Sequence, residues 1–165
     1  MAIVDALLPE FDRETTTTRK LLERVPDDKW DWKPHEKSMS LRQLASHLAT
    51  LPSWGEMTMT QPEFDLGGDF KQPEMHNRAD LVATFDKVVA ATRQAMTGKS
   101  DAEMMAPWTL KRSGKTIFTM PKIAVMRSFV LNHLIHHRGQ LSVYLRLNDV
   151  PLPSIYGPSA DEQPF

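Results

Sequence analysis

Three of the six histidines in this chain lie within five positions of one another: His133, His136 and His137. On a helix, His133 and His137 share one face with Cβ atoms roughly 5–6 Å apart, so both imidazoles can reach one ion. His136 points about 100° away from His137 around the helix axis, which indicates a boundary position or a subunit contact. The spacing therefore predicts two imidazole ligands for a divalent metal ion.

A third histidine, far upstream, completes the candidate site. His47 is three residues after Leu44 and four before Leu51, which places it on an apolar face of its own predicted helix. Three imidazoles directed into one small core, with no carboxylate on these faces, would leave polar nitrogens without partners. One ion satisfies three of them at once, so we predict that His47, His133 and His137 bind it.

The chemistry available to such a site is that of an open metal centre. Three neutral imidazoles leave the ion its 2+ charge and at least one free position, and such an ion lowers the pKa of bound water to ~7 or converts a bound thiol to thiolate. The sequence has no cysteine, so any thiol must arrive as a substrate. Gln140, one turn after His137, is predicted to hydrogen-bond to a ligand. Arg138 points off the ligand face, and an exposed or interfacial salt bridge is predicted for it.

Several common catalytic motifs are missing. The histidine run reads HLIHH, with Leu134 where a zinc protease of the H-E-x-x-H type has its glutamate. The chain has no G-x-S-x-G elbow, no P-loop and no dinucleotide-binding glycine pattern. Two interpretations stay open: an enzyme in which the metal activates water or a small thiol, and a non-catalytic or structural protein. Three imidazoles suit Zn, Ni, Co or Cu alike, so the spacing does not identify the metal.

The whole chain has the composition of a soluble globular protein. Its 165 residues are 41% hydrophobic and 25% charged, and 20 Lys and Arg against 21 Asp and Glu give a net charge of −1. This balance provides no attraction for phosphate and argues against nucleic-acid binding. The N-terminus has no basic leader, and no uncharged apolar stretch approaches the ~20 residues of a membrane span. A cytoplasmic protein that does not bind a membrane is predicted.

The first two elements that position the candidate ligands are amphipathic helices. Pro9 is predicted in the first turn of the N-terminal helix, unless that helix begins earlier and bends there. Ser40 and Gln43 form a capping box that opens the second helix, and Pro52 is predicted to kink or shift it. The predicted core-facing residues recur at spacings of three and four: Phe11, Thr15, Thr18, Leu22, Val25, Leu41, Leu44, Leu48 and Leu51.

The last two helices begin at recognisable signals. Asn77 is predicted to cap the third helix and Gly98 to end it. Pro121 is predicted as the first position of the fourth helix, which runs to about Leu147 and carries the histidine pair. The core-facing residues predicted for the third helix are Leu81, Phe85, Val88, Thr92 and Ala95.

The connections complete the predicted architecture. The stretch TQPEFDLGGDFKQPEMH, residues 60–76, has no periodicity and is predicted to be a long surface loop. The stretch WTLKRSGKTIFTM alternates around a Ser-Gly turn and predicts a small hairpin. Residues 149–165 are predicted to form an extended tail that lies back along the helices. The predicted fold class is all-α: residues 1–165 form one four-helix-bundle domain, with a long crossover between its second and third helices.

These features together resemble the DinB-like family of metal-binding four-helix bundles. The resemblance rests on a histidine in the second helix, on NHLIHHRGQLSVYLR in the last helix and on the following VPLPSIYGPS, and it covers nearly the whole chain. It implies that His47, His133 and His137 hold one divalent ion, zinc or nickel, and that the protein is a homodimer. Some relatives are transferases or isomerases that use low-molecular-weight thiols. A metal-dependent hydrolase or small-thiol-dependent transferase with a small-molecule substrate is therefore expected, without nucleic-acid binding.

Overall fold

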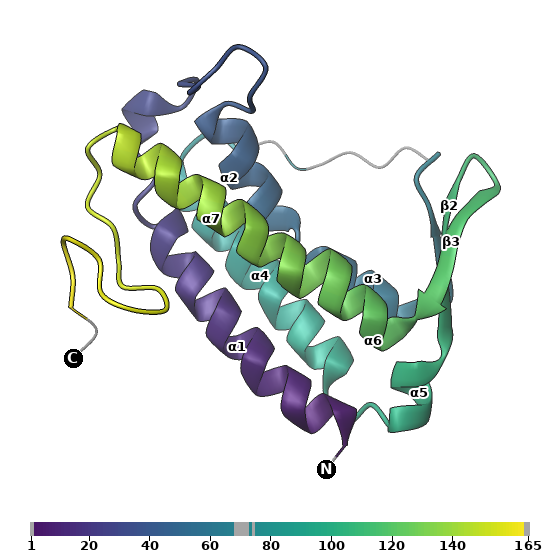
Figure 1. The fold of residues 1–165 in the computed structure, drawn as a ribbon. Helices are drawn as coiled ribbons and strands as arrows, with labels where there is room; N and C mark the ends of the chain where they lie inside the picture. The colour runs from purple at the N-terminus through teal and green to yellow at the C-terminus, as the bar shows by residue number, and fades with distance from the viewer. Residues whose placement is uncertain (1, 68–72, 74, 164–165) are drawn as a thin grey trace.

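The computed structural model describes residues 2–67, 73 and 75–163, and these residues are mostly helical with a small three-stranded sheet (Figure 1). The predicted helical class is confirmed to that extent, whereas part of the predicted crossover loop, residues 68–72 and 74, lies outside the described residues. None of the described helices has the length and apolar character that a membrane span requires. The elements in chain order are α1 (Ile3–Leu22), a 3-10 turn (Asp27–Lys29), α2 (Leu41–Thr50), α3 (Ser53–Thr60), β1 (Glu63–Asp65), α4 (Arg78–Met96), α5 (Asp101–Met105), β2 (Pro107–Arg112), β3 (Lys115–Pro121), α6 (Lys122–Val125), a π-helical segment (Met126–Leu131) and α7 (Asn132–Leu147).

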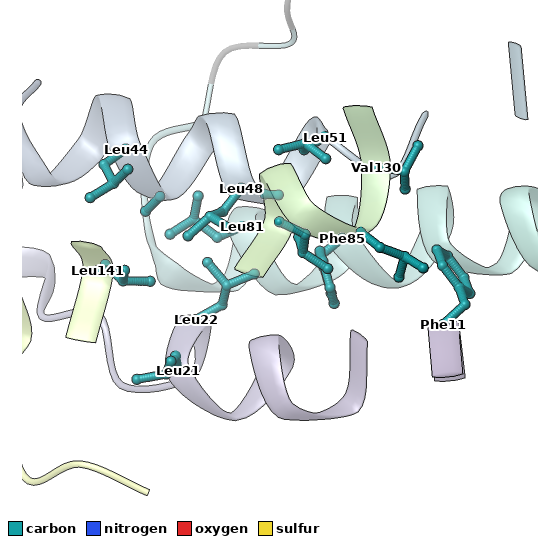
Figure 2. Packing of buried hydrophobic residues seen from close by; sticks show 14 of the residues in the cluster. Phe11, Leu21, Leu22, Leu44, Leu48, Leu51, Leu81, Phe85, Val130 and Leu141 are labelled. Atoms are coloured by element: carbon teal, nitrogen blue, oxygen red, sulfur yellow. The ribbon is translucent and has the colours of Figure 1, made fainter. Parts of the chain in front are cut away.

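The long helices pack around one apolar core. Helix α1 packs against both α4 and α7, and α2 packs against the same two helices (Figure 1). Leucine and phenylalanine side chains from all of these helices meet between them (Figure 2). The stripes predicted for the first two helices are buried throughout. In α4, Val88 and Ala95 are only half-buried and Met96 is buried instead, because α4 packs against three helices and its burial does not follow one stripe.

The predicted helix starts are confirmed by cap hydrogen bonds. Ser40 Oγ accepts from the Gln43 N–H at 3.2 Å, and Gln43 Oε1 accepts from the Ser40 N–H at 2.8 Å. Asn77 Oδ1 accepts from a backbone N–H in the first turn of α4 at 2.9 Å. Helix α1 begins at Ile3, so Pro9 lies inside it, which is the second of the two predicted alternatives.

Pro52 separates the second predicted helix into two, α2 and α3. Its missing N–H interrupts the hydrogen-bond ladder of the helix, while its carbonyl accepts a hydrogen bond from the buried Thr92 hydroxyl at 2.6 Å. A Cβ atom on Gly55 would lie 2.4 Å from Thr92 Cγ2, so α3 approaches α4 as closely as only a glycine allows. The break therefore serves the packing of α3 against α4.

The predicted hairpin is confirmed, and a third strand joins it. Strands β2 and β3 pair antiparallel around a turn at Ser113 and Gly114, both of which have positive φ. Strand β1 pairs parallel to β2, with Glu63 opposite Thr109, so the prediction of an unstructured loop is wrong here. The Asp65 carboxylate accepts from the backbone N–H groups of Ser113 and Gly114, each at 2.8 Å. These are contacts between distant segments, which local periodicity does not report.

The histidine-bearing helix changes its hydrogen-bond pattern along its length. It begins at Lys122 with Pro121 as N-cap, and it continues through the π-helical segment into α7, which ends at Leu147. Short π-helical segments inside α-helices are rare and frequently lie at functional sites. This one ends two residues before His133.

The tail after α7 has no regular secondary structure and is docked. Arg24, two residues after the end of α1, donates to the Pro151 carbonyl at 2.9 Å and binds the Glu162 carboxylate at 3.1 Å. Leu152 and Ile155 pack against the core. The predicted return of the tail along the helices is confirmed for the described part.

Candidate metal centre

The structure brings the three predicted ligands together. His47 lies in the last turn of α2, and His133 and His137 lie in the first half of α7. The Nε2 atom of His133 is 3.3 Å from Nε2 of His47 and 2.9 Å from Nε2 of His137. Nitrogens bound to one tetrahedral ion at ~2.0–2.1 Å lie about 3.4 Å apart. One ion therefore fits between the three rings with a small adjustment.

In His133 and His137 the Nδ1 atom, which points away from the cluster, carries the ring hydrogen. The Nε2 atom of each ring therefore presents a lone pair to the cluster. His137 Nδ1 lies 2.7 Å from Gln140 Oε1, and an amide oxygen only accepts, so Nδ1 carries the hydrogen. The His133 ring hydrogen-bonds to the backbone of Phe129, and Nδ1 must donate because Nε2 faces His47 and His137. Two lone pairs thus face each other at 2.9 Å, which is repulsive unless a cation lies between them. The donor set fits a metal ion.

Burial keeps the rings neutral, the form that binds metal. Loss of hydration, together with the neighbouring charges of His137 and His133, lowers the pKa of His47 to about 4. Burial also lowers the pKa values of His133 and His137 below the usual histidine range. At neutral pH the site therefore presents three uncharged nitrogens.

His136 stands outside the cluster. Its side chain is exposed, and its ring meets His137 edge-on with 4.8 Å between ring centroids. Its exposure agrees with the prediction that His136 points away from the ligand face, while the predicted boundary position or subunit contact stays a prediction.

The ligand histidines lie at the edge of the helix packing, which corrects the sequence prediction that their face points into the core. His133 and His137 are half-buried, whereas Leu134, Arg138 and Leu141 are buried. The core-facing stripe of α7 passes through these three residues and is offset from the histidines. The edge position makes the cluster accessible to a small molecule.

The prediction of an exposed or interfacial salt bridge for Arg138 is wrong about its environment. Arg138 is 1% exposed, and its guanidinium binds the carboxylate of the buried Glu14 at 2.7 Å. It also donates to the Glu14 carbonyl at 3.1 Å and to the Tyr156 hydroxyl at 2.5 Å. Tyr156 in turn donates to the Glu14 carboxylate at 2.7 Å. This buried ion pair joins α1, α7 and the tail next to the ligand His137.

A cavity beside the cluster was not predicted from the sequence. It has a volume of about 690 Å³, and His47 is one of its lining residues. The segment before α2 contributes Lys37 and Ser38 to it, and His76, the last residue of the predicted surface loop, also lines it. Only the folded chain brings these segments together.

Gln140→Ala is expected to weaken Zn²⁺ binding by roughly 10–100-fold, because His137 loses the acceptor that fixes its tautomer and ring orientation. Gln140→Glu keeps an acceptor there and is expected to retain the affinity. Competition titration with a chromogenic chelator measures both. Gln140 is exposed, so neither variant should lose the fold. Unchanged affinity in Gln140→Ala would show that this contact does not orient the ligand.

The comparisons with known proteins agree on one family. A sequence model described as the DinB family matches residues 2–164. The chain is 25% identical to the uncharacterized protein YjoA of Bacillus subtilis over 146 residues, covering 85% of this chain and 87% of YjoA. It is 26% identical to the uncharacterized protein YrdA of the same organism over 162 residues, covering 96% and 91% of the two chains.

Two crystal structures share the fold. A DinB-like protein from Bacillus cereus superposes with a TM-score of 0.74 at 22% identity, covering 94% of this chain and 98% of that one. The YjoA structure from B. subtilis superposes with a TM-score of 0.69 at 20% identity, covering 87% and 92% of the two chains. At these identities the likeness concerns the fold alone.

Proposed function

Since the chain belongs to the DinB family, we propose that it binds one divalent metal ion through His47, His133 and His137. The observation that supports this most is the inward-facing pair of Nε2 atoms of His133 and His137, 2.9 Å apart. Zinc and nickel are the first candidates, because imidazole ligands suit both. The scaffold in this proposal is a four-helix bundle in which α2–α3 and α6–α7 each count as one interrupted helix.

We further propose that the site is catalytic, in a metal-dependent hydrolase or a small-thiol-dependent transferase. When bound, the ion supplies a Lewis acid that favours the deprotonated form of a water or a small thiol. The chain itself presents three neutral nitrogens at the edge of the helices. A closed structural site would need a fourth protein ligand, and within the described part of the chain no further His, Asp or Glu joins the three. This favours catalysis over a purely structural ion.

The proposal also concerns partners. A thiol, if used, comes from solution because the chain has no cysteine, and the net charge of −1 gives no reason to expect a nucleic acid. We propose a cytoplasmic homodimer. Val143 and Leu147, exposed one turn apart on α7, are candidate contacts between subunits, and sedimentation measurements would test this assembly.

Adding Zn²⁺ or Ni²⁺ to metal-free protein is expected to raise its Tm near pH 7.5 and to raise it much less near pH 4, where His47 takes up a proton in the folded state. An ion that binds only the folded state stabilises it by ~2.7 kcal/mol at a hundred times Kd. Protons compete for the same nitrogens, so the increment shrinks as the pH falls. Thermal melting of protein without a histidine tag, with and without the ion, measures this rise in Tm.

The metal-free protein should show its own pH dependence. The folded-state pKa of His47 is about 4, against ~6.5 in the unfolded chain. Between these values the unfolded chain binds more protons, so stability rises with pH through this window and is fully present above about 6.5. In the melting experiment with added metal, Mg²⁺ is the control ion because it prefers oxygen ligands. No rise in Tm with Zn²⁺ or Ni²⁺ near pH 7.5 would contradict the proposed metal site.

A further inference from the structure

The cavity of about 690 Å³ beside His47 has the size of a small-molecule site. One wall is formed by the segment before α2 and by the side of α2 on which the candidate ligand His47 lies. Apolar and polar groups share the lining, as they do in sites that bind metabolites. The described residues that carry the argument are Lys37, Met39, Arg42, Ser46, His47 and Met75.

The charged side chains in the described lining of this cavity are all positive. Lys37 and Arg42 contribute two cations, and no Asp or Glu is among the described lining residues. Lys37 has no ion-pair partner in the part of the chain that the structure describes. Arg42 pairs with Asp31 at 3.1 Å, but their side chains are 50% and 78% exposed. Such an exposed pair is weak, and a guanidinium has five N–H donors, so Arg42 can still bind an anion.

We propose that the cavity binds a small molecule with an acidic group, a carboxylate or a phosphate, at Lys37 and Arg42. Arginine recognises both groups through paired hydrogen bonds. Met39 and Met75 contact the apolar body of the ligand, and its reactive end reaches the ion at His47. The inference rests on the proposed metal site, and it names the substrate class of that site.

The spacing along α2 sets the length of a suitable probe. Arg42 and His47 are five residues apart, which corresponds to about 7.5 Å along the helix axis. An extended 6-mercaptohexanoate molecule has a comparable length, with a thiol at one end and a carboxylate at the other. The alcohol 6-mercaptohexan-1-ol has the same length and no charge. The two probes therefore isolate the contribution of the acidic group.

Cobalt-loaded protein reports binding directly, because a thiolate on Co²⁺ gives a charge-transfer absorption band. We expect 6-mercaptohexanoate to bind with a Kd at least about tenfold lower than that of the alcohol, since it adds charge-assisted hydrogen bonds. In Lys37→Gln/Arg42→Gln the acid should lose this advantage, while the affinity for the alcohol stays unchanged. The matched control is Lys87→Gln/Arg112→Gln, which removes two exposed cations elsewhere and should keep the preference.

Competition with acetate and with inorganic phosphate identifies the acidic group. Displacement of the acid probe by either anion supports the proposal, and the stronger competitor shows which group the cavity prefers. Equal affinities for the acid and the alcohol, or displacement by neither anion, would overturn the cavity proposal and leave the metal site intact. Absence of the absorption band with both thiols would instead contradict the open metal position on which the inference rests.

Discussion

His137→Ala is expected to lower the affinity for Zn²⁺ by more than about 100-fold, whereas His136→Ala is expected to leave it unchanged. Losing a hydrogen bond to a ligand already costs roughly 10–100-fold, and losing the ligand removes a metal–nitrogen bond as well. The Nε2 atom of His137 faces His133 at 2.9 Å, while the neighbouring His136 is exposed. Metal content by mass spectrometry and a chelator competition titration measure the difference.

His136→Ala and His137→Ala are controls for each other, because both replace a histidine of α7 by alanine. His47→Ala and His133→Ala should repeat the loss seen in His137→Ala. Similar losses of metal from His136→Ala and His137→Ala would show that the ligand face of α7 has been wrongly identified. Circular dichroism of the metal-free variants checks that each retains its helices.

Arg138→Met is expected to lower the free energy of unfolding by about 3–5 kcal/mol, because it removes the buried cation beside Glu14 and leaves only the exposed Arg13 at 4.0 Å from that carboxylate. Urea denaturation followed by circular dichroism measures the change. The matched control is Arg93→Met, which breaks the pair with Asp12 at 2.9 Å, where the side chains are 50% and 40% exposed. An exposed pair contributes about 1 kcal/mol or less.

The double variant Glu14→Gln/Arg138→Met separates the value of the pair from the cost of an unpaired charge. It removes both charges, so we expect it to be clearly more stable than Arg138→Met alone. Tyr156→Phe, which loses only the hydroxyl, should cost about 1 kcal/mol. A loss in Arg138→Met no larger than in Arg93→Met would mean that the buried pair does not stabilise the packing of α1 on α7.

The features that the sequence predicted well are local ones. A cap such as Ser40 with Gln43 is a hydrogen-bond pattern within four residues, so its residue types identify it. The spacing of three and four likewise predicted the buried stripe of α1 from Phe11 to Leu22. His47 could be placed beside His133 because both lie on helix faces that also carry apolar residues. The predicted convergence of the rings was correct, although the rings meet at the edge of the helix packing and not in the core.

The features that were missed depend on contacts between distant segments. Strand β1 forms only because β2 lies next to it, and Asp65 then bonds to the hairpin turn. Arg138 looked like a surface residue since its partner Glu14 lies on another helix, where an acidic residue also gives no apolar signal. The cavity is formed by Lys37 and His76 from separate connections, and no periodicity describes a connection.

The π-helical segment Met126–Leu131 is a place where the chain can lose one residue without disturbing the ligand geometry. Each π-type turn closes around one residue more than an α-type turn. In a regular α-helix, removing a residue rotates everything beyond it by about 100°. Removing one residue from this segment would instead convert it to α-helix. His133 and His137 would then keep their orientation relative to the preceding β2–β3 hairpin. Relatives with a one-residue gap here are therefore expected to retain the ligand geometry, whereas a gap between the two histidines would abolish it.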